Sequence, residues 1–235
     1  MEIDKWLSNI QDWLLPRLCP ACGGWAGPGQ DLCVGCEREL PRLINACRRC
    51  AAPFEHPAIP GECGQCQRRP PPYTRTLALF HYAPPVDHFI RTLKFHHGLG
   101  MATLLGRQFA NRLLTERGLP DRIMPVPLHR ARLRSRGYNQ ALELARPIAS
   151  TLGIPLDYRS LQRIRATAAQ SGLSVVQRGR NMRGAFSVRP EIRLDDLRIV
   201  LVDDVLTTGS TVAAASHALL AAGAREIEVW VVARA

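Results

Sequence analysis

The chain has 235 residues, 46% of them apolar, which suits one large α/β domain or a standard domain with a small module. No apolar run approaches the roughly 18 residues that cross a bilayer, and acids and amides interrupt the N-terminal segment MEIDKWLSNIQDWLLP, so neither a transmembrane segment nor a signal peptide is predicted. We therefore expect a cytoplasmic protein, and the formal net charge of +11 indicates an anionic ligand.

The N-terminal third is dominated by cysteine. Apolar residues at helical spacing predict an amphipathic helix over residues 3–14. All eight cysteines then fall in Cys-x2-Cys pairs, which are Cys19/Cys22, Cys33/Cys36, Cys47/Cys50 and Cys63/Cys66. Disulfides are the alternative, but thiols persist in a reducing compartment, so structural zinc is the better account. Two zinc ions bound by sequential pairs close shorter loops than a cross-braced arrangement would, which favours the sequential order.

The prolines at 70–72 form a stiff linker and predict a domain boundary there. Residues 1–69 would hold the N-terminal helix and a double zinc ribbon, and residues 70–235 a second domain. In that domain the pattern predicts a strand over Tyr73–Tyr82, helices over Val86–Lys94 and Met101–Leu114, and a strand over Arg122–Leu128.

Arginine is concentrated in the middle of the second domain. Between Arg130 and Arg183 there are eleven arginines and only two acids, Glu143 and Asp157. Arg130, Arg132, Arg134 and Arg136 alternate with other residues just before a predicted helix over Asn139–Leu152. Such a run is usually a solvated face, but strand-to-helix junctions are also where phosphates bind. A second basic stretch, from Leu161 to Phe186, lacks a clear period and is predicted as a loop.

The strongest motif is IVLVDDVLTTGSTV at residues 199–212. Ile199–Val202 reads as a buried parallel strand, and Asp203 and Asp204 follow where we expect that strand to end. A helix is predicted from Val212 to Gly223, and its N-terminus would offer free N–H groups to a phosphate. Together with these N–H groups, a hydroxyl-rich loop would bind the phosphate; it consists of Thr207, Thr208, Gly209, Ser210 and Thr211. The alternative is an ordinary capped turn with solvated acids.

This motif resembles the phosphoribosyl pyrophosphate (PRPP) motif of type I phosphoribosyltransferases. The resemblance implies an α/β fold with a mainly parallel sheet flanked by helices and a site at the sheet's carboxyl edge. It also implies that Asp203 and Asp204 bind the ribose 2′ and 3′ hydroxyls, that residues 207–211 bind the 5′-phosphate, and that Mg²⁺ accompanies PRPP.

Further motifs resemble the ComF family of competence-associated, phosphoribosyltransferase-like proteins. They are Leu93-Lys94-Phe95, Pro127-Leu128-His129-Arg130, Arg136-Gly137-Tyr138-Asn139-Gln140, Arg165-x-Thr167-x-x-Gln170, and Arg178 with Asn181 and Gly184-Ala185-Phe186. The resemblance implies a cytoplasmic protein needed for natural transformation, which acts on incoming single-stranded DNA and has the DNA-uptake machinery as a partner.

Two functions fit this sequence. The first is pentosyl transfer from PRPP, with Asp203, Asp204, Lys94 and Arg165 as candidate catalytic residues and Arg130 and Arg136 as further phosphate ligands. The second is a non-catalytic nucleic-acid-binding protein that keeps the fold as a nucleotide sensor or scaffold. Our candidate DNA contacts are Arg132, Arg134, Arg178 and Arg180.

Overall fold

The computed structural model describes residues 18–54, 61–95, 98–114, 118–166 and 182–235, so the predicted N-terminal helix lies outside the described residues. The described elements, in chain order, are α2 (Val34–Arg38), α3 (Gly64–Arg68), β1 (Arg75–His81), α4 (Val86–Phe95), α5 (Leu99–Leu113), β2 (Arg122–Pro125), α6 (Arg130–Arg136), α7 (Gln140–Leu152), β3 (Leu161–Arg163), β4 (Phe186–Val188), β5 (Arg198–Leu206), α9 (Ser210–Ala221) and β6 (Glu226–Arg234). No described helix has the length and apolar character needed to cross a membrane.

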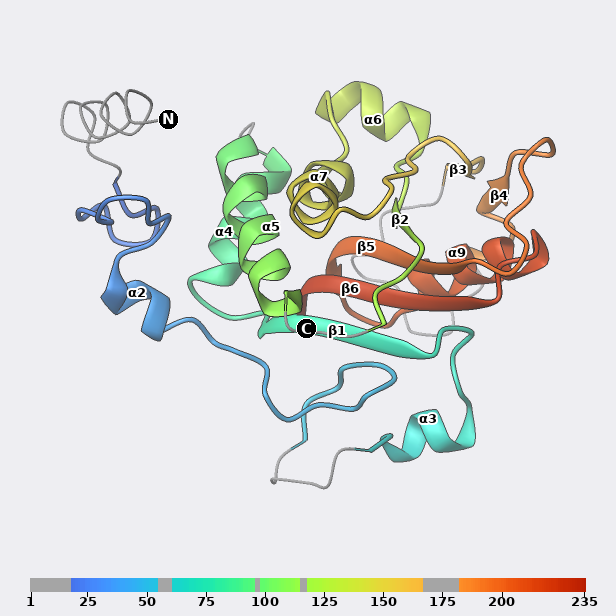
Figure 1. The fold of residues 1–235 in the computed structure, drawn as a ribbon, viewed down its shortest axis with the longest axis horizontal. Helices are drawn as coiled ribbons and strands as arrows, with labels where there is room; N and C mark the ends of the chain where they lie inside the picture. The colour runs from blue at the N-terminus through green and yellow to red at the C-terminus, as the bar shows by residue number, and fades with distance from the viewer. Residues whose placement is uncertain (1–17, 55–60, 96–97, 115–117, 167–181) are drawn as a thin grey trace.

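The part of the chain from β1 onward is built on a four-stranded parallel sheet in the order β1-β6-β5-β2 (Figure 1). A separate antiparallel pair joins β3 to β4. Strand β5 lies in the interior of the large sheet, between β6 and β2. Because all four strands run the same way, their carboxyl ends share one edge, where ligands of open α/β sheets gather.

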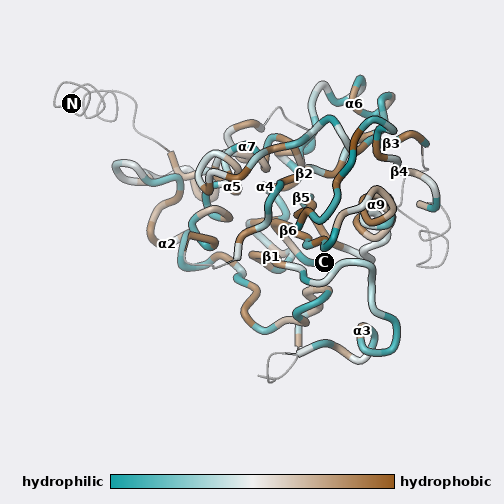
Figure 2. The backbone as a smooth tube through the Cα atoms, turned by 45° about the vertical axis from the view of Figure 1, so that its right-hand side comes forward, coloured by the Kyte–Doolittle hydropathy of each residue, from teal (hydrophilic) through white to brown (hydrophobic). Residues whose placement is uncertain are grey.

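Alternate residues of the interior strands face two separate cores. Val200 and Val202 pack with α4, α5 and α7, whereas Ile199 and Leu201 pack with α9 and β4. Both faces of the sheet are therefore covered, as the continuous apolar run of β5 predicts. In Figure 2 the hydrophobic colour gathers on the strands and on α9, while α6 is hydrophilic.

Most of the predicted elements are present, with shifted ends. The strand predicted over Tyr73–Tyr82 is β1, and the helix predicted from Val212 begins two residues earlier as α9. The arginine run from Arg130 to Arg136, for which no helix was predicted, forms helix α6, which His129 caps at its start and Gly137 (φ +84°) closes. The stretch from Leu161, expected as a loop, begins with β3 and ends with β4.

The end of β5 corrects a second expectation. The strand was expected to end at Val202, but it continues through both aspartates to Leu206. The reason is its partner: β6 offers backbone groups as far as Arg234, so Asp203, Val205 and Leu206 all find a register partner on it. The aspartates are thus held by the sheet itself, which fixes their backbone more firmly than a turn would.

The packing of α5 on α7 generates a stability prediction. A methyl group added at Gly106 would lie 2.3 Å from Pro147 Cγ and 2.9 Å from the Leu144 carbonyl oxygen, so the two helices must separate. Gly106→Ala should destabilise the protein by about 1 to 3 kcal/mol, measured by thermal unfolding. Gly100→Ala in the same helix meets nothing within 4 Å and should be neutral or slightly stabilising. Equal effects of the two substitutions would contradict this packing.

Candidate functional site

The eight cysteines form two groups of four. Cys19, Cys22, Cys33 and Cys36 make one group and Cys47, Cys50, Cys63 and Cys66 the other, and within each group the Sγ atoms lie within 4.8 Å of one another. The predicted sequential pairing is confirmed. Backbone N–H groups point at the sulfurs, for example Gly24 N at 3.4 Å from Cys22 Sγ and Cys63 N at 3.2 Å from Cys47 Sγ. Four converging thiols with such support fit tetrahedral Zn²⁺.

The two cysteine groups dock on different parts of the molecule (Figure 1). The first lies beside α5, where Arg107 pairs with Asp31 at 3.3 Å and Gln108 donates to Glu37 at 2.8 Å. The segment leading into the second group runs along the free edge of β1, with Leu43 N donating to the Leu79 carbonyl at 2.9 Å. This segment covers an exposed sheet edge that would otherwise offer unpaired backbone groups.

The acidic pair lies in the carboxyl half of β5. Asp204 is 4% exposed, and its Oδ1 accepts a hydrogen bond from Val205 N at 2.7 Å. Its Oδ2 is buried and accepts no hydrogen bond of good geometry from the described residues, although Lys94 Nζ lies 3.0 Å away. Lys94 at the end of α4 thus compensates the Asp204 charge, while the carboxylate can still accept a hydrogen bond from a ligand hydroxyl.

Asp203 is half-buried beside this pair. Burial and the neighbouring Asp204 carboxylate raise the pKa of Asp203 to about 7. The N–H of Asp204, which donates to Asp203 Oδ1 at 2.8 Å, and the cations Lys94 and Arg163 offset only part of that rise. Two negative charges on the neighbouring carboxylates are therefore unfavourable in this site. A bound cation, or a hydroxyl group that donates a hydrogen bond to the carboxylates, would reduce that cost.

Four basic side chains surround the acids. A cavity of about 160 Å³ is lined by Lys94, Arg132, Arg136 and Arg163 together with Asp203, Asp204, Gln140, Thr211, Val126, Pro127 and Leu128. Desolvation lowers the pKa values of Arg136 and Arg163 from their ordinary range. Because an arginine side chain is not deprotonated in proteins, both guanidinium groups carry a positive charge. The cavity therefore combines two carboxylates with four cations, a balance that suits a polyanion carrying hydroxyls.

The segment Gly137–Gln140 holds this arrangement together. The Tyr138 hydroxyl donates to the Leu93 carbonyl next to Lys94. Asn139 caps α7 through Ala141 N at 3.1 Å, and buried Gln140 accepts from Arg136 Nη1 at 2.6 Å. The segment thereby fixes Lys94 from one side of the cavity and Arg136 from the other.

The loop after β5 forms a separate small hollow of about 20 Å³, lined by residues 205–212 and by Asp203. Gly209 has φ +77° and precedes the twelve-residue helix α9, and the Thr208 and Ser210 hydroxyls lie 2.8 Å apart. A side chain at Gly209 would be strained by its φ and would meet the Tyr73 hydroxyl at 2.9 Å. Backbone N–H groups, hydroxyls and the helix N-terminus together make a cradle suited to a phosphate.

The structure separates the other predicted residues. Arg132, expected to contact DNA, lines the acidic cavity instead, whereas Arg130, expected to contact phosphate there, lines a larger cleft. Arg134 and Arg165 are exposed and line neither space. Arg178 and Arg180 lie outside the described residues, as do Thr167, Gln170 and Asn181.

Sequence reasoning missed Arg163. It lies in the three-residue strand β3, with its guanidinium 5.6 Å from the Phe186 ring centroid and Nη2 3.9 Å from Met182 Sδ. No period could reveal so short a strand. The available signal was an arginine between Leu161 and Ile164, two apolar residues in a stretch otherwise rich in polar side chains.

A larger cleft, of about 660 Å³, adjoins the acidic cavity and shares Pro127, Leu128 and Arg163 with it. Three large apolar side chains that are exposed to solvent line it: Leu133 (40%), Tyr158 (45%) and Ile164 (59%). Arginines also line it, at positions 130, 159 and 189, and Glu143 is the carboxylate among its described lining residues. Apolar surface beside guanidinium groups is suited to bases and phosphates of a nucleic acid.

Known proteins match most of the chain. A double zinc ribbon domain model matches residues 10–67, and a phosphoribosyl transferase domain model matches residues 139–235. The DNA utilization protein YhgH of Salmonella typhimurium is 39% identical over 94% of this chain and 98% of its own length, and competence protein F of Haemophilus influenzae is 33% identical over 87% and 90%. The chain belongs to the ComF family.

A solved structure is also similar. The adenine phosphoribosyl transferase of Trypanosoma brucei, in complex with AMP, pyrophosphate and ribose 5-phosphate, is 16% identical over 66% of the chain and 69% of its own length, with a TM-score of 0.42. For this ComF family member, the parallel sheet and the domain models establish the type I phosphoribosyltransferase fold with its double zinc ribbon.

The raised pKa of Asp203 predicts a pH effect on stability. Between its ordinary value of 3.8 and about 7, the folded protein retains a proton that the unfolded chain releases, so stability falls as pH rises through this window. Asp203→Asn removes the titration and should raise the melting temperature relative to wild type more at pH 8.5 than at pH 5.5. Glu191→Gln, on an exposed side chain (64%), is the control. A gain in melting temperature that is the same at both pH values would refute the raised pKa of Asp203.

Proposed function

We propose that this protein binds PRPP or a nucleoside 5′-monophosphate at the carboxyl edge of its sheet. The observation that carries the proposal is the continuity of two subsites along one segment. Asp203 lines both the acidic cavity and the hollow of the loop 205–212, so one ligand can span them. The loop hydroxyls and amides would hold the 5′-phosphate, and the Asp203 and Asp204 carboxylates would accept hydrogen bonds from the ribose 2′ and 3′ hydroxyls.

The donor set also fits Mg²⁺ with PRPP. Carboxylate oxygens are the ligands this ion prefers, and the buried Oδ2 of Asp204 accepts no hydrogen bond within the described structure. When bound, Mg²⁺ would neutralise part of the charge on a pyrophosphate. The protein's own share falls to Lys94, Arg132, Arg136 and Arg163, whose positive charges would hold the pyrophosphate and stabilise it as it leaves the ribose.

Pentosyl transfer would need an acceptor beside the ribose. The larger cleft opens next to the acidic cavity and shares Arg163 with it, so an acceptor held there would approach the same ligand. The alternative is a non-catalytic protein that senses a nucleotide at the acidic cavity and binds nucleic acid at the cleft. The two differ in whether pyrophosphate is released, which a coupled pyrophosphate assay measures directly.

Ligand binding is tested by two substitutions with different actions. Asp204→Asn removes a charged acceptor, and hydrogen bonds to charged groups are worth about 1.5 to 3 kcal/mol, so calorimetric affinity for PRPP with Mg²⁺ should fall roughly tenfold to a hundredfold. Gly209→Val should abolish binding, since the side chain meets Tyr73 and disfavours the positive φ. Glu191→Gln should bind as wild type does. Unchanged affinity in Asp204→Asn, with the protein folded, would remove the proposed ribose contact.

We further propose that the larger cleft, which we term the arginine cleft, handles single-stranded DNA. The names of the relatives, DNA utilization protein and competence protein, support a role with DNA. Tyr158 is 45% exposed in the cleft, with the Arg159 guanidinium 5.3 Å from its ring centroid, so an aromatic face and a cation lie together. Bases would stack on Tyr158 while Arg130, Arg159 and Arg189 contact phosphates.

Oligonucleotide binding separates this cleft from the arginines first expected to contact DNA. Fluorescence anisotropy with oligo(dT) should show that Arg130→Ala with Arg159→Ala lowers the slope of log affinity against log salt by about 1.4, or about 0.7 per phosphate contact. Tyr158→Ala should weaken binding without changing the slope. Arg134→Ala, outside the cleft, is the matched control. If Arg134→Ala matters and the cleft variants do not, DNA follows the outer face of α6 instead.

A further inference from the structure

The second cysteine group reaches the loop that follows β5 through one arginine. Arg234, the last residue of β6, donates from Nε to the Cys50 carbonyl at 3.2 Å and from Nη1 to the Leu206 carbonyl at 3.0 Å. Leu206 is the last residue of β5, immediately before Thr207. One guanidinium thus joins the turn that carries a zinc ligand to the start of the proposed phosphate cradle.

Tyr73 makes a second connection between the same two places. Its side chain is 3% exposed and packs in one core with Ala51, beside Cys50, and with Leu206 and Val212 on either side of the loop. The hydroxyl stands so close to Gly209 that a Cβ there would lie 2.9 Å from it. The end of the Tyr73 side chain therefore lies directly against the turn at Gly209, whose φ is +77°.

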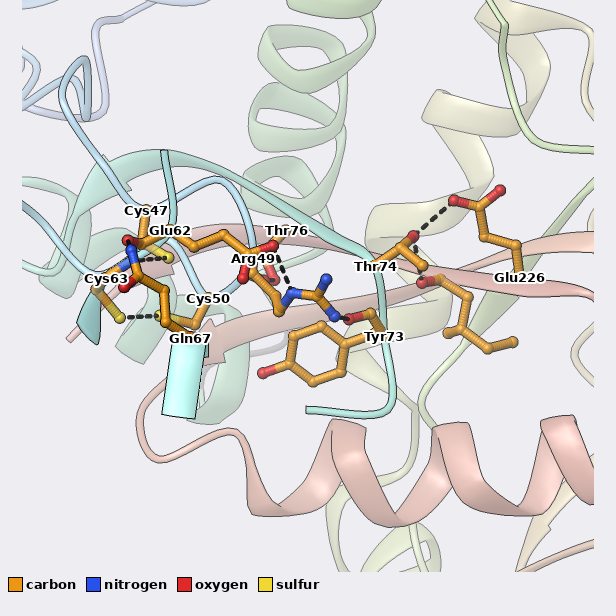
Figure 3. Close-up of polar contacts among 11 residues, drawn as sticks. Cys47, Arg49, Cys50, Glu62, Cys63, Gln67, Tyr73, Thr74, Thr76 and Glu226 are labelled. Atoms are coloured by element: carbon orange, nitrogen blue, oxygen red, sulfur yellow. Dashed lines mark hydrogen bonds and ion pairs between the residues drawn. The ribbon is translucent and has the colours of Figure 1, made fainter. Parts of the chain in front are cut away.

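The backbone of Tyr73 is itself fixed by the second cysteine group. Arg49, between Cys47 and Cys50, donates from Nη1 to the Tyr73 carbonyl at 3.4 Å and pairs with Glu62 beside Cys63 at 2.8 Å (Figure 3). The Thr76 hydroxyl donates to the Arg49 carbonyl at 2.6 Å, which joins the same turn to β1. The position of Tyr73 consequently depends on the folded turn around Cys47 and Cys50.

The first cysteine group has no such connection among the described residues. Cys19 and its neighbours belong to the core on the other face of the sheet, with α4, α5 and α7, and their polar contacts run to α5. The two groups have similar chemistry but different neighbours. They therefore offer a matched comparison within one chain.

We propose that Arg234 and Tyr73 are positioning residues that fasten the phosphate-binding loop to the second zinc site, so that metal at Cys47, Cys50, Cys63 and Cys66 is required for ligand binding. This inference rests on the proposed phosphoribosyl site. A structural zinc site contributes folding free energy to its own turns, and a loop held in its bound conformation loses less entropy when a ligand arrives. Loss of the second zinc would release the turn around Cys50, and with it Arg234, Tyr73 and the loop.

The experiment compares Cys63→Ser with Cys22→Ser in the full-length protein. Mass spectrometry should find one zinc fewer in each. Hydrogen exchange of the amides at residues 206–211 should rise at least tenfold in Cys63→Ser and stay unchanged in Cys22→Ser. Thermal protection by ribose 5-phosphate should disappear only in Cys63→Ser. Arg234→Met, which retains the aliphatic stem, should keep both zinc ions and weaken ribose 5-phosphate binding roughly three- to tenfold, the loss expected for one ordinary hydrogen bond that positions the loop without touching the ligand.

Arg225→Met, on an exposed arginine paired with Asp196, is the control for Arg234→Met and should bind as wild type does. If Cys63→Ser leaves exchange at residues 206–211 unchanged, the proposed coupling is wrong. If Cys63→Ser unfolds the whole chain, the proposal is tested by Arg234→Met and Tyr73→Phe alone. If both variants bind two zinc ions and hydrogen exchange at residues 206–211 is unchanged in both, the proposal is overturned. Wild-type protein that shows no ribose 5-phosphate binding, but the expected exchange differences, would refute the proposed ligand and leave the coupling standing.

Discussion

The burial of Asp204 is the constraint on which the site depends. A carboxylate that is 4% exposed on an interior strand must be compensated, because an unpaired buried charge is strongly destabilising. Lys94 supplies that compensation at 3.0 Å, and it comes from the end of α4, more than a hundred residues earlier in the chain. Tyr138 holds the neighbouring Leu93 carbonyl, so the segment before α7 is also drawn into place. One buried charge therefore brings β5, α4 and the turn after α6 to the same cavity.

The sheet and the second zinc ribbon provide the rigid support that a phosphate site requires. Because β5 continues beside β6 as far as Leu206, the acids and the first residue of the loop share the ladder of a parallel sheet. The segment leading into the second zinc ribbon runs along the edge strand β1 of that sheet. The ribbon also contacts the loop after β5 through Arg234 and Tyr73. A zinc module joined in this way is part of the architecture of the ligand site. The division predicted at residue 69 remains a prediction about domains, and these contacts cross it.

The sequence predicted the cysteine grouping correctly, since that grouping depends on local spacing. The ligand-binding roles of the acidic pair and of the loop after it remain predictions. The sequence did not predict which arginines converge, because that depends on the secondary structure of the run. In an extended segment Arg130, Arg132, Arg134 and Arg136 are each two residues apart and would all point to the same side. In helix α6, where successive residues turn by about 100°, Arg132 and Arg136 share one face and reach the acids, while Arg130 turns to the arginine cleft. Arg163 escaped prediction because its strand has only three residues and is placed by pairing with β4, a long-range contact with no local signal.

The central claim is that one ligand spans the loop and the acids, and a crystal structure of the protein with PRPP and Mg²⁺ tests it most directly. The account predicts density for the 5′-phosphate against the amides and hydroxyls of residues 207–211. The ribose hydroxyls should lie within hydrogen-bonding distance of Asp203 and Asp204, with the pyrophosphate facing Lys94, Arg136 and Arg163. A ligand bound wholly in the arginine cleft, with the loop after β5 empty, would contradict it.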